Sequence, residues 1–201
     1  MKISLVDYGV SNLPSVERAF ERLGAAVERA AGPERIAAAQ AIVLPGVGHF
    51  SAFVEALRRR GLASPLAEAR ARGVPILGIC LGMQALFSGS EEAPGESGLG
   101  FFSAGVRALP ATVKSPHIGW NQVRPTRKSA LLGGVGANDY FYFAHSYAAP
   151  AQAEPTVAAC DHGVAFAAAI ECENVMGVQF HPEKSGEAGA RVLRNFLEAA
   201  R

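Results

Sequence analysis

The chain has 201 residues, of which 49% are hydrophobic and 18% charged, and its formal net charge is +1. This length and composition fit a single globular domain over residues 1–201 and exclude a disordered chain. Because there is no basic block and no apolar stretch approaching about 18 residues, we expect neither a nucleic-acid partner nor a membrane span.

The first half of the chain alternates between short apolar runs and segments with helical spacing. Ser11 and Asn12 are suited to cap the first helix. Strands are expected at 3–6, 26–28, 41–44 and 74–79, and helices from about 14 to 24, from 33, at about 51–60 and from 64 to 73. This alternation predicts an α/β fold, with a mainly parallel sheet covered by helices on both faces.

The second half begins with a polar, Gly-rich loop at 91–100 and then becomes strand-like. Strands are expected at 113–123, 140–148, 157–159, 164–170 and 175–180, with tight turns at 161–163 and 173–174 and a closing helix at about 187–200. Hairpin turns imply antiparallel strands, so the sheet should be mixed. Ligands of such sheets bind at the carboxyl ends of the parallel strands.

Cys80 stands where the 74–79 strand meets a helix expected at 81–87, with Gly78 and Gly82 two residues away on either side. This is the pattern of a nucleophile elbow with cysteine in place of serine. Side chains at the two glycines would collide across the turn or with a bound substrate. The start of a helix would also favour a thiolate at Cys80.

A cysteine at the end of a strand is, taken alone, more often a small buried packing residue. His181 and Glu183 favour the catalytic interpretation, because a thiolate nucleophile needs a base and the base needs an orienting group. Pro182 between them prevents a regular helix, so the carboxylate can turn back toward the imidazole. The elbow and the His-Pro-Glu triplet together predict a Cys80–His181–Glu183 triad.

The other cysteines and histidines are expected to play structural roles. Three cysteines without a Cys-x-x-Cys pair argue against disulfides or a zinc site and are consistent with a reducing cytoplasm. The remaining histidines have no metal-ligand spacing, and we expect no metal and no cofactor. His145 lacks an acid two residues on, so His181 is preferred as the base. The cysteines and histidines expected to play structural roles are Cys160, Cys172, His49, His117, His145 and His162.

The segments 78–84 and 181–183 resemble the class I (triad) glutamine amidotransferase family, whose fold is flavodoxin-like. Four further segments resemble the glutaminase subunits of imidazole glycerol phosphate synthase, which act in histidine biosynthesis: 7–13, 45–50, 117–121 and 181–185. Ser11 departs from the glycine usual in these subunits. The resemblance implies that Cys80 attacks the side-chain amide of L-glutamine and that the resulting thioester is hydrolysed to glutamate.

The tetrahedral intermediates need preorganised hydrogen-bond donors, worth about 3–4 kcal/mol each. Elbow geometry makes the backbone N–H of Leu81 one donor. The turn at 45–48 should supply the second, from Val47 or Gly48, although the turn can equally be an ordinary strand-to-helix connection. By resemblance, the amino-acid end of the substrate is held by Gly48, Gln84, Ser146 and Tyr147.

In this family the ammonia passes to a (β/α)₈-barrel cyclase subunit, so the resemblance implies a heterodimer. The chain is too short to contain that barrel itself. By resemblance, the partner interface includes Asn12, Trp120, Asn121, Tyr142 and Lys184. The competing interpretations are core packing for Trp120 and a solvated charge for Lys184.

Three alternatives remain open. The first is a glutaminase of another pathway, against which Trp120–Asn121 and Lys184–Ser185 argue because they lie outside the shared catalytic segments. The second is a cysteine peptidase with a similar elbow, which would need a groove for an extended chain. The third is a non-catalytic interaction subunit, which the presence of all three triad residues disfavours.

Overall fold

A computed structural model of the chain describes residues 1–9 and 12–201, so the expected cap Ser11 lies outside the described residues. Within these residues eight strands form one sheet in the order β2-β1-β3-β4-β12-β11-β10-β7. The strands are β1 (Lys2–Val6), β2 (Ala26–Ala30), β3 (Ile42–Gly46), β4 (Ile76–Cys80), β7 (Arg124–Pro125), β10 (Thr156–Asp161), β11 (Ala165–Cys172) and β12 (Val175–Val178). The pairs from β2 to β12 are parallel, and the remaining pairs are antiparallel.

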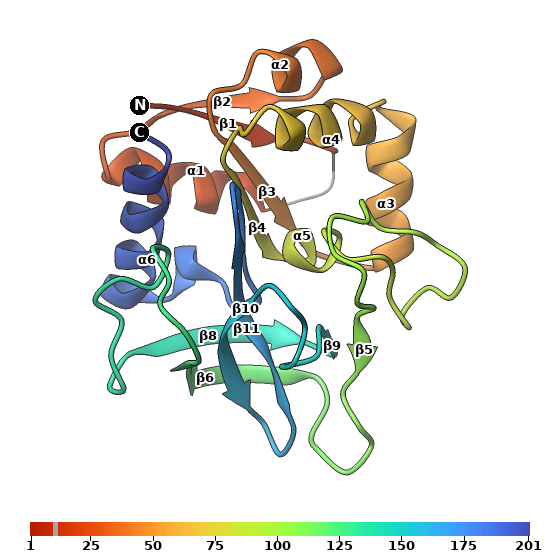
Figure 1. The fold of residues 1–201 in the computed structure, drawn as a ribbon, viewed down its shortest axis with the longest axis vertical. Helices are drawn as coiled ribbons and strands as arrows, with labels where there is room; N and C mark the ends of the chain where they lie inside the picture. Colours follow the sequence, from red (N-terminus) through yellow and green to blue (C-terminus); the bar gives the residue numbers. More distant parts are fainter. Residues whose placement is uncertain (10–11) are drawn as a thin grey trace.

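Two smaller antiparallel pairs lie beside this sheet. β6 (His117–Gln122) pairs with β8 (Tyr140–His145), and β5 (Arg107–Ala108) pairs with β9 (Tyr147–Ala148). In Figure 1 β6 and β8 cross the lower part of the molecule, while β1, β2 and β3 lie in its upper part. The strands from the first and second halves of the chain thus meet in the middle of the molecule, where β4 pairs with β12.

Helices cover both faces of the sheet. They are α1 (Leu13–Arg22), α2 (Pro33–Ala37), α3 (Phe50–Arg59), α4 (Ala63–Ala71), α5 (Leu81–Gln84), α6 (Gly186–Ala199) and a 3₁₀ turn, η1 (Pro182–Lys184). On one face Phe20 of α1 packs edge to face against Phe196 of α6, with ring centroids 6.3 Å apart. On the other face Phe53 and Leu66 bring α3 and α4 into a second buried cluster. Apolar residues at helical spacing thus form the core on each side of the sheet.

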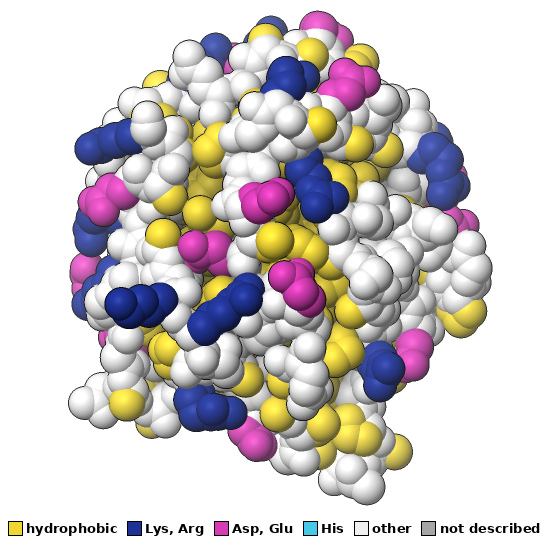
Figure 2. Space-filling view, in the orientation of Figure 1, with side chains coloured by type: hydrophobic (Ala, Val, Ile, Leu, Met, Phe, Trp, Pro, Cys, Tyr) yellow, Lys and Arg dark blue, Asp and Glu magenta, His cyan; other side chains and the backbone are white. Residues whose placement is uncertain are grey.

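The surface seen in Figure 2 carries Lys and Arg side chains interspersed with Asp and Glu, without a large region of one sign. No helix in the described part of the chain is both long and apolar enough to cross a membrane.

The expected fold class is confirmed: the sheet is mixed, its first half is parallel, and helices lie on both faces. The helix expected at 81–87 is wrong in length, because α5 ends at Gln84. The carbonyl groups of Ala85, Leu86 and Phe87 accept hydrogen bonds from N–H groups of residues 99–102 instead of continuing a helix. The loop that follows therefore ends the helix by taking its hydrogen-bond acceptors.

Three further expectations differ from the structure. The strand expected at 113–123 begins only at His117, because Val113 lies in a turn in which its N–H donates to the Pro110 carbonyl. The strand expected at 140–148 breaks at Ser146 into β8 and β9. Asn12 occupies the cap position of α1 without a side-chain bond to the backbone, and its Oδ1 accepts a hydrogen bond from the Ser15 hydroxyl instead.

Candidate active site

Cys80 lies at the junction of β4 and α5 with φ 54° and ψ −111°, a sparsely populated conformation for a residue with a side chain. The neighbouring glycines permit this sharp turn. A Cβ atom on Gly82 would lie 1.8 Å from the Leu44 carbonyl oxygen, and one on Gly78 would lie 2.7 Å from the Met83 Cα. The predicted collision therefore occurs with the backbones of β3 and α5, which pack directly against the turn.

A pocket of about 260 Å³ opens beside Cys80. The residues around it come from the turn after β3, the junction of β4 with α5, the polar loop after α5, the junction of β8 with β9, and the segment of η1: Val47, Gly48, Cys80, Leu81, Gln84, Glu92, Ala144, His145, Ser146, Tyr147, His181 and Lys184. Two larger cavities, of about 740 and 440 Å³, lie along residues 121–137 and share only Asn121 with the predicted sites. The smaller pocket is where the predicted catalytic and substrate residues gather.

His181 reaches this pocket from the segment after β12, and Glu183 lies behind it, outside the pocket wall. Nδ1 of His181 lies 2.8 Å from Oε1 of Glu183, and both side chains are almost completely buried. The backbone is held by Ser185, whose hydroxyl donates to the His181 carbonyl and accepts from the N–H of Tyr142. Pro182 opens the 3₁₀ turn that brings the carboxylate back to the imidazole. Nε2 is then the imidazole nitrogen left to face Cys80.

The environment of His181 favours its protonated form. Burial alone lowers the pKa of this imidazole, but hydrogen bonds and charge attraction from Cys80 and Glu183 outweigh burial and raise the pKa to about 10. Within the described residues, Oε2 of Glu183 is buried without a hydrogen-bond partner, so the carboxylate depends on the imidazolium for compensation. The surroundings of His181 therefore favour an imidazolium beside Cys80.

His145 also lines the pocket, but both of its ring nitrogens are engaged. Nδ1 lies 3.0 Å from the Tyr147 carbonyl oxygen, which can only accept, so Nδ1 carries the proton. Nε2 must then accept from Nδ1 of His117, at 3.1 Å. Burial, followed by the neighbouring imidazoles, lowers the pKa of His145 to about 3. His145 is thus a neutral structural residue without a nitrogen free to accept a proton from Cys80.

Among the residues proposed to bind the oxyanion, Val47, Gly48 and Leu81 all border the pocket. The N–H of Val47, however, donates to the hydroxyl of the buried Tyr8 at 3.3 Å. Gly48 has φ 97°, a conformation that favours glycine. The N–H of Val47, one of the two donors expected for the second oxyanion position, therefore already has a hydrogen-bond partner in Tyr8.

The predicted substrate residues Gly48, Gln84, Ser146 and Tyr147 line the same pocket. Glu92 lines it too, and the sequence analysis missed this residue. The Glu92 carboxylate is held over the pocket because its Oε2 accepts from the N–H of Phe50, at the start of α3. The only sign of Glu92 in the sequence was an acidic residue in the polar loop at 91–100. The loop sequence alone does not indicate which part of the fold the loop contacts.

The predicted interface residues divide into three groups. Trp120 is 56% exposed, which excludes core packing, and it meets Tyr142 edge to face with Lys184 over the same tyrosine ring. Asn121 instead uses its amide within the chain, donating to the Asp161 carbonyl and accepting from the N–H of Gln122. Asn12 lies apart, beside a cavity of about 10 Å³ that Glu183 also lines.

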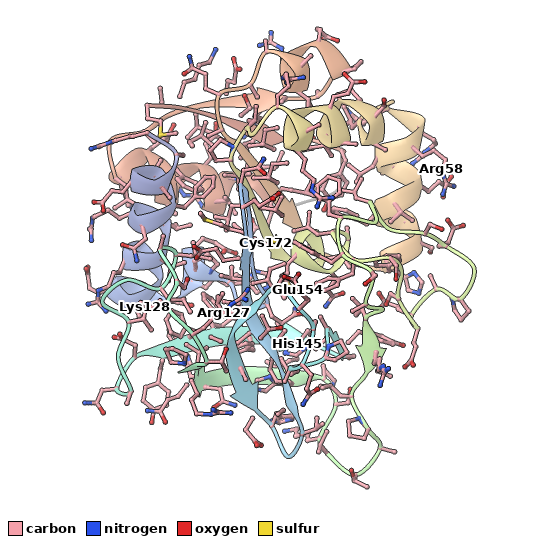
Figure 3. The ribbon with its side chains drawn as sticks, viewed as in Figure 1. Arg58, Arg127, Lys128, His145, Glu154 and Cys172 are labelled. Atoms are coloured by element: carbon pink, nitrogen blue, oxygen red, sulfur yellow. The ribbon has the colours of Figure 1, made fainter. Side chains whose placement is uncertain are left out.

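Other titratable groups lie away from the pocket. Figure 3 labels Cys172, at the end of β11, and the pocket residue His145, on β8. The two lie in different parts of the molecule. Burial raises the pKa of the Cys160 thiol to about 12 and also raises that of Cys172. In the part of the chain that the structure describes, no cluster of three or more His, Cys, Asp or Glu side chains could hold a metal ion.

Comparison with known proteins identifies close sequence relatives. A family model described as glutamine amidotransferase class-I matches residues 4–200. The imidazole glycerol phosphate synthase subunit HisH of Moorella thermoacetica is 46% identical over 200 residues, which cover 99% of this chain and 95% of that protein. The protein of the same name from Xanthomonas axonopodis pv. citri is 48% identical over 198 residues, covering 98% of this chain and 96% of that protein.

Solved structures share the fold at lower identity. A crystal structure described as glutamine amidotransferase has a TM-score of 0.78 at 19% identity and covers 98% of both chains. PurLQS from Thermotoga maritima has a TM-score of 0.77 at 20% identity, covering 100% of this chain and 99% of that one. The glutaminase domain of Trypanosoma brucei CTPS, with bound acivicin, has a TM-score of 0.74 at 19% identity and covers 100% and 93%.

Proposed function

This chain belongs to the class I glutamine amidotransferase family, and from that premise we propose that it hydrolyses L-glutamine through Cys80, His181 and Glu183 and supplies the ammonia to the cyclase subunit of imidazole glycerol phosphate synthase. One observation carries the catalytic assignment: the strained Cys80 turn and His181 border one pocket, and the Glu183 carboxylate lies 2.8 Å from Nδ1 of that His181. The proposal takes residues 1–201 as one domain, since strands from both halves of the chain share one sheet.

In the first half-reaction the sulfur of Cys80 attacks the side-chain amide carbon of glutamine. The amide oxygen becomes an oxyanion, which backbone N–H groups of Leu81 and of the Val47–Gly48 turn would stabilise. His181, protonated in the resting enzyme, gives its proton to the departing nitrogen, and ammonia leaves as the thioester forms. Glu183 keeps the imidazole oriented and stabilises its charge throughout.

The second half-reaction needs His181 as a base. Once the sulfur is acylated, it no longer carries the charge that helps to raise the pKa of His181, whereas burial continues to lower that pKa. The same imidazole can therefore take a proton from water, and the hydroxide attacks the thioester to release glutamate. The change of charge on Cys80 thus switches His181 from acid to base.

The shape and charge of the pocket suit an amino acid. Glu92 supplies a negative charge that complements the α-ammonium group of glutamine. Gly48, Gln84, Ser146 and Tyr147 surround the remaining space and would hold the amino-acid end of the substrate. A peptidase would need an extended groove, whereas this pocket is small enough to favour a single residue as substrate.

An exposed face beside the pocket supports the assignment of a protein partner. Ile118 and Trp120 of β6 and Tyr140 of β8 are between 51% and 63% exposed, although they are large and apolar or aromatic. Trp120 contacts Tyr142, and Lys184 lies over the same tyrosine ring. Because Lys184 also lines the pocket, these contacts connect the exposed face to the pocket wall. Large apolar residues exposed together mark a docking surface. We assign this face to the cyclase subunit, a (β/α)₈ barrel that forms a heterodimer with this chain.

Glutamate release from glutamine tests the proposal in three mixtures: the chain alone, with the cyclase subunit, and with that subunit plus its nucleotide substrate. We expect slow turnover by the chain alone and a large rise in the full mixture. Cys80→Ala should lower turnover by about 10⁴-fold or more, because it removes the nucleophile. Absence of turnover in every mixture of folded proteins would disprove the proposal.

Cys172→Ala is the matched control. It removes a thiol of the same kind, whose pKa is raised and which lies outside the pocket, so turnover should stay near that of the parent chain. Equal losses in the two variants would show that the assay reports general damage rather than loss of a nucleophile. Peptide cleavage without glutamine turnover would instead favour a cysteine peptidase.

A further inference from the structure

Gln179 touches the sulfur of Cys80, although it does not line the pocket. It directly follows β12 and is completely buried. Its Nε2 lies 3.6 Å from Sγ of Cys80, a hydrogen-bond distance for sulfur. Because the pocket wall contains Cys80 but not Gln179, the carboxamide approaches the sulfur from the protein side and leaves the pocket side open to substrate.

The orientation of this carboxamide follows from its partners. Gln84 has a side-chain nitrogen 2.8 Å from the carbonyl oxygen of Tyr147, and a carbonyl can only accept, so this atom must be the NH₂ group of Gln84. The same NH₂ group lies 3.0 Å from Gln179, whose facing atom must therefore be its acceptor Oε1. The other end of the Gln179 carboxamide, which faces the sulfur, is consequently its NH₂ group.

The sulfur thus has two neighbours of opposite character. The Ala144 carbonyl, 4.0 Å away, can only accept and suits a thiol. The NH₂ group of Gln179 can only donate and suits a thiolate. A buried donor without a partner is destabilising, and donation to an anion is stronger than donation to a neutral group. Since Gln84 prevents the carboxamide from turning over, the fixed donor favours the negative form of sulfur.

From this geometry we infer that Gln179 is a catalytic residue that donates a hydrogen bond to the Cys80 thiolate, and that Gln84 is the positioning residue that holds the Gln179 carboxamide in that orientation. This inference rests on Cys80 being the nucleophile of the proposed function. It goes further by assigning a donor that is separate from the triad and from the oxyanion-binding groups. It also gives Gln84 a second role besides lining the substrate pocket.

Alkylation by iodoacetamide measures the thiolate without any glutamine turnover. The rate is recorded against pH on the full chain carrying Cys172→Ala, and the site of modification is confirmed by mass spectrometry. Gln179→Met keeps much of the side-chain volume but removes the donor. We expect the midpoint of its rate profile to move upward by about one pH unit, with alkylation below that midpoint about tenfold slower. Gln179→Glu, which places carboxylate oxygens beside the sulfur, should move the midpoint further.

Asn195→Leu provides a matched control. Asn195 is also a carboxamide, partly rather than completely buried, which donates to the carbonyls of Leu131 and Gly133 and does not line the pocket. Its removal should lower the thermal unfolding midpoint and leave the alkylation profile unchanged. A folded Gln179→Met variant with the parent profile would overturn the inference and make Gln179 a packing residue.

Gln84→Met supplies a second test that leaves Gln179 in place, for the case that Gln179→Met does not fold. Without its anchor the carboxamide can rotate, so the profile should shift in the same direction by a smaller amount. An unchanged profile in this folded variant would also contradict the inference. Failure of the proposed function would give a different result from failure of this inference, because glutamine turnover would survive Cys80→Ala. The turnover assay does not depend on alkylation.

Discussion

The backbone of Cys80 has a conformation that costs free energy for any residue with a side chain, and surrounding contacts must hold it there. Gly82 makes this possible, because its lack of a side chain lets α5 approach the carbonyl of Leu44 on β3. The Cys80 sulfur is thereby fixed at the carboxyl end of β4. Strain at a single residue is offset by close packing of two backbone segments.

Gly82→Ala should therefore be strongly destabilising. Its Cβ would lie 1.8 Å from a backbone oxygen that cannot rotate away, so β3 and α5 would have to separate. We expect the free energy of unfolding in urea to fall by at least about 3 kcal/mol. Gly136→Ala is the control, since no atom lies within 4 Å of a Cβ at that position. Equal stability of the two variants would show that the elbow is not tightly packed.

At the scale of elements, the β6–β8 pair depends on neutral histidines. His117 of β6 and His145 of β8 are hydrogen-bonded to each other, and His162 stacks on His117 with ring centroids 4.1 Å apart. Burial, followed by the charge of His162, lowers the pKa of His117 to about 4. A second proton on His145 would place its Nε2–H against the Nδ1–H of His117, and a second proton on His117 would place its Nε2–H against the side-chain NH₂ of Asn121.

Acid should consequently weaken the fold. Below about pH 6.5 the unfolded chain binds protons at these imidazoles, whereas the folded chain binds them only near pH 4 at His117 and pH 3 at His145. The free energy of unfolding should therefore fall as pH decreases from about 6.5 to about 3. His181 has the opposite shift, so its contribution is complete below pH 6.5 and is lost only as pH rises toward 10.

Urea unfolding at pH 7 and pH 5 measures this effect. His145→Asn keeps a donor near the Tyr147 carbonyl without a titrating ring, so the difference in unfolding free energy between the two pH values should shrink. His49→Asn removes an exposed histidine outside the pair and should retain the parent difference. A parent chain equally stable at both pH values would contradict this account.

The sequence predicts those elements whose signals are local. The alternation of apolar runs and helical segments predicts the parallel half of the sheet, and Gly78, Cys80 and Gly82 predict the elbow before any contact is known. The length of α5 could not be predicted, because residues 99–102 compete for its carbonyls from a distance. Gln179 and Glu92 were missed for the same reason: only the fold brings them to Cys80 and to the pocket.

At the scale of the whole molecule, the pocket and the exposed β6–β8 face lie side by side. Tyr142 and Lys184 connect them, so a partner docked on that face would cover the pocket wall. This arrangement suits an enzyme whose product must reach a second subunit without release to water. The roles of Asn12 and Asn121 in that interface stay predictions, and the internal hydrogen bonds of Asn121 also give it a structural role.

Trp120→Ala should weaken binding of the cyclase subunit by about 2 kcal/mol, or about 30-fold in Kd, because large exposed aromatic side chains contribute strongly to the interfaces they form. Titration calorimetry measures the affinity, and thermal unfolding of the isolated chain measures its stability, which should change little. Glu68→Ala, on α4 away from this face, is the control. A Trp120→Ala chain that binds as tightly as the parent would place the partner elsewhere.

The central position of β12 has a consequence for the order in which the molecule can mature. β12 fills the place between β4 and β11, yet it is the last strand to be synthesised. A ribosome-bound chain that stops before residue 175 would hold Cys80 on an unpaired strand edge, without the Gln179 carboxamide and the His181 imidazole that lie beside its sulfur in the complete fold. Reactivity toward thiol reagents should therefore arise late in biosynthesis, when the carboxyl-terminal segment emerges and completes the sheet.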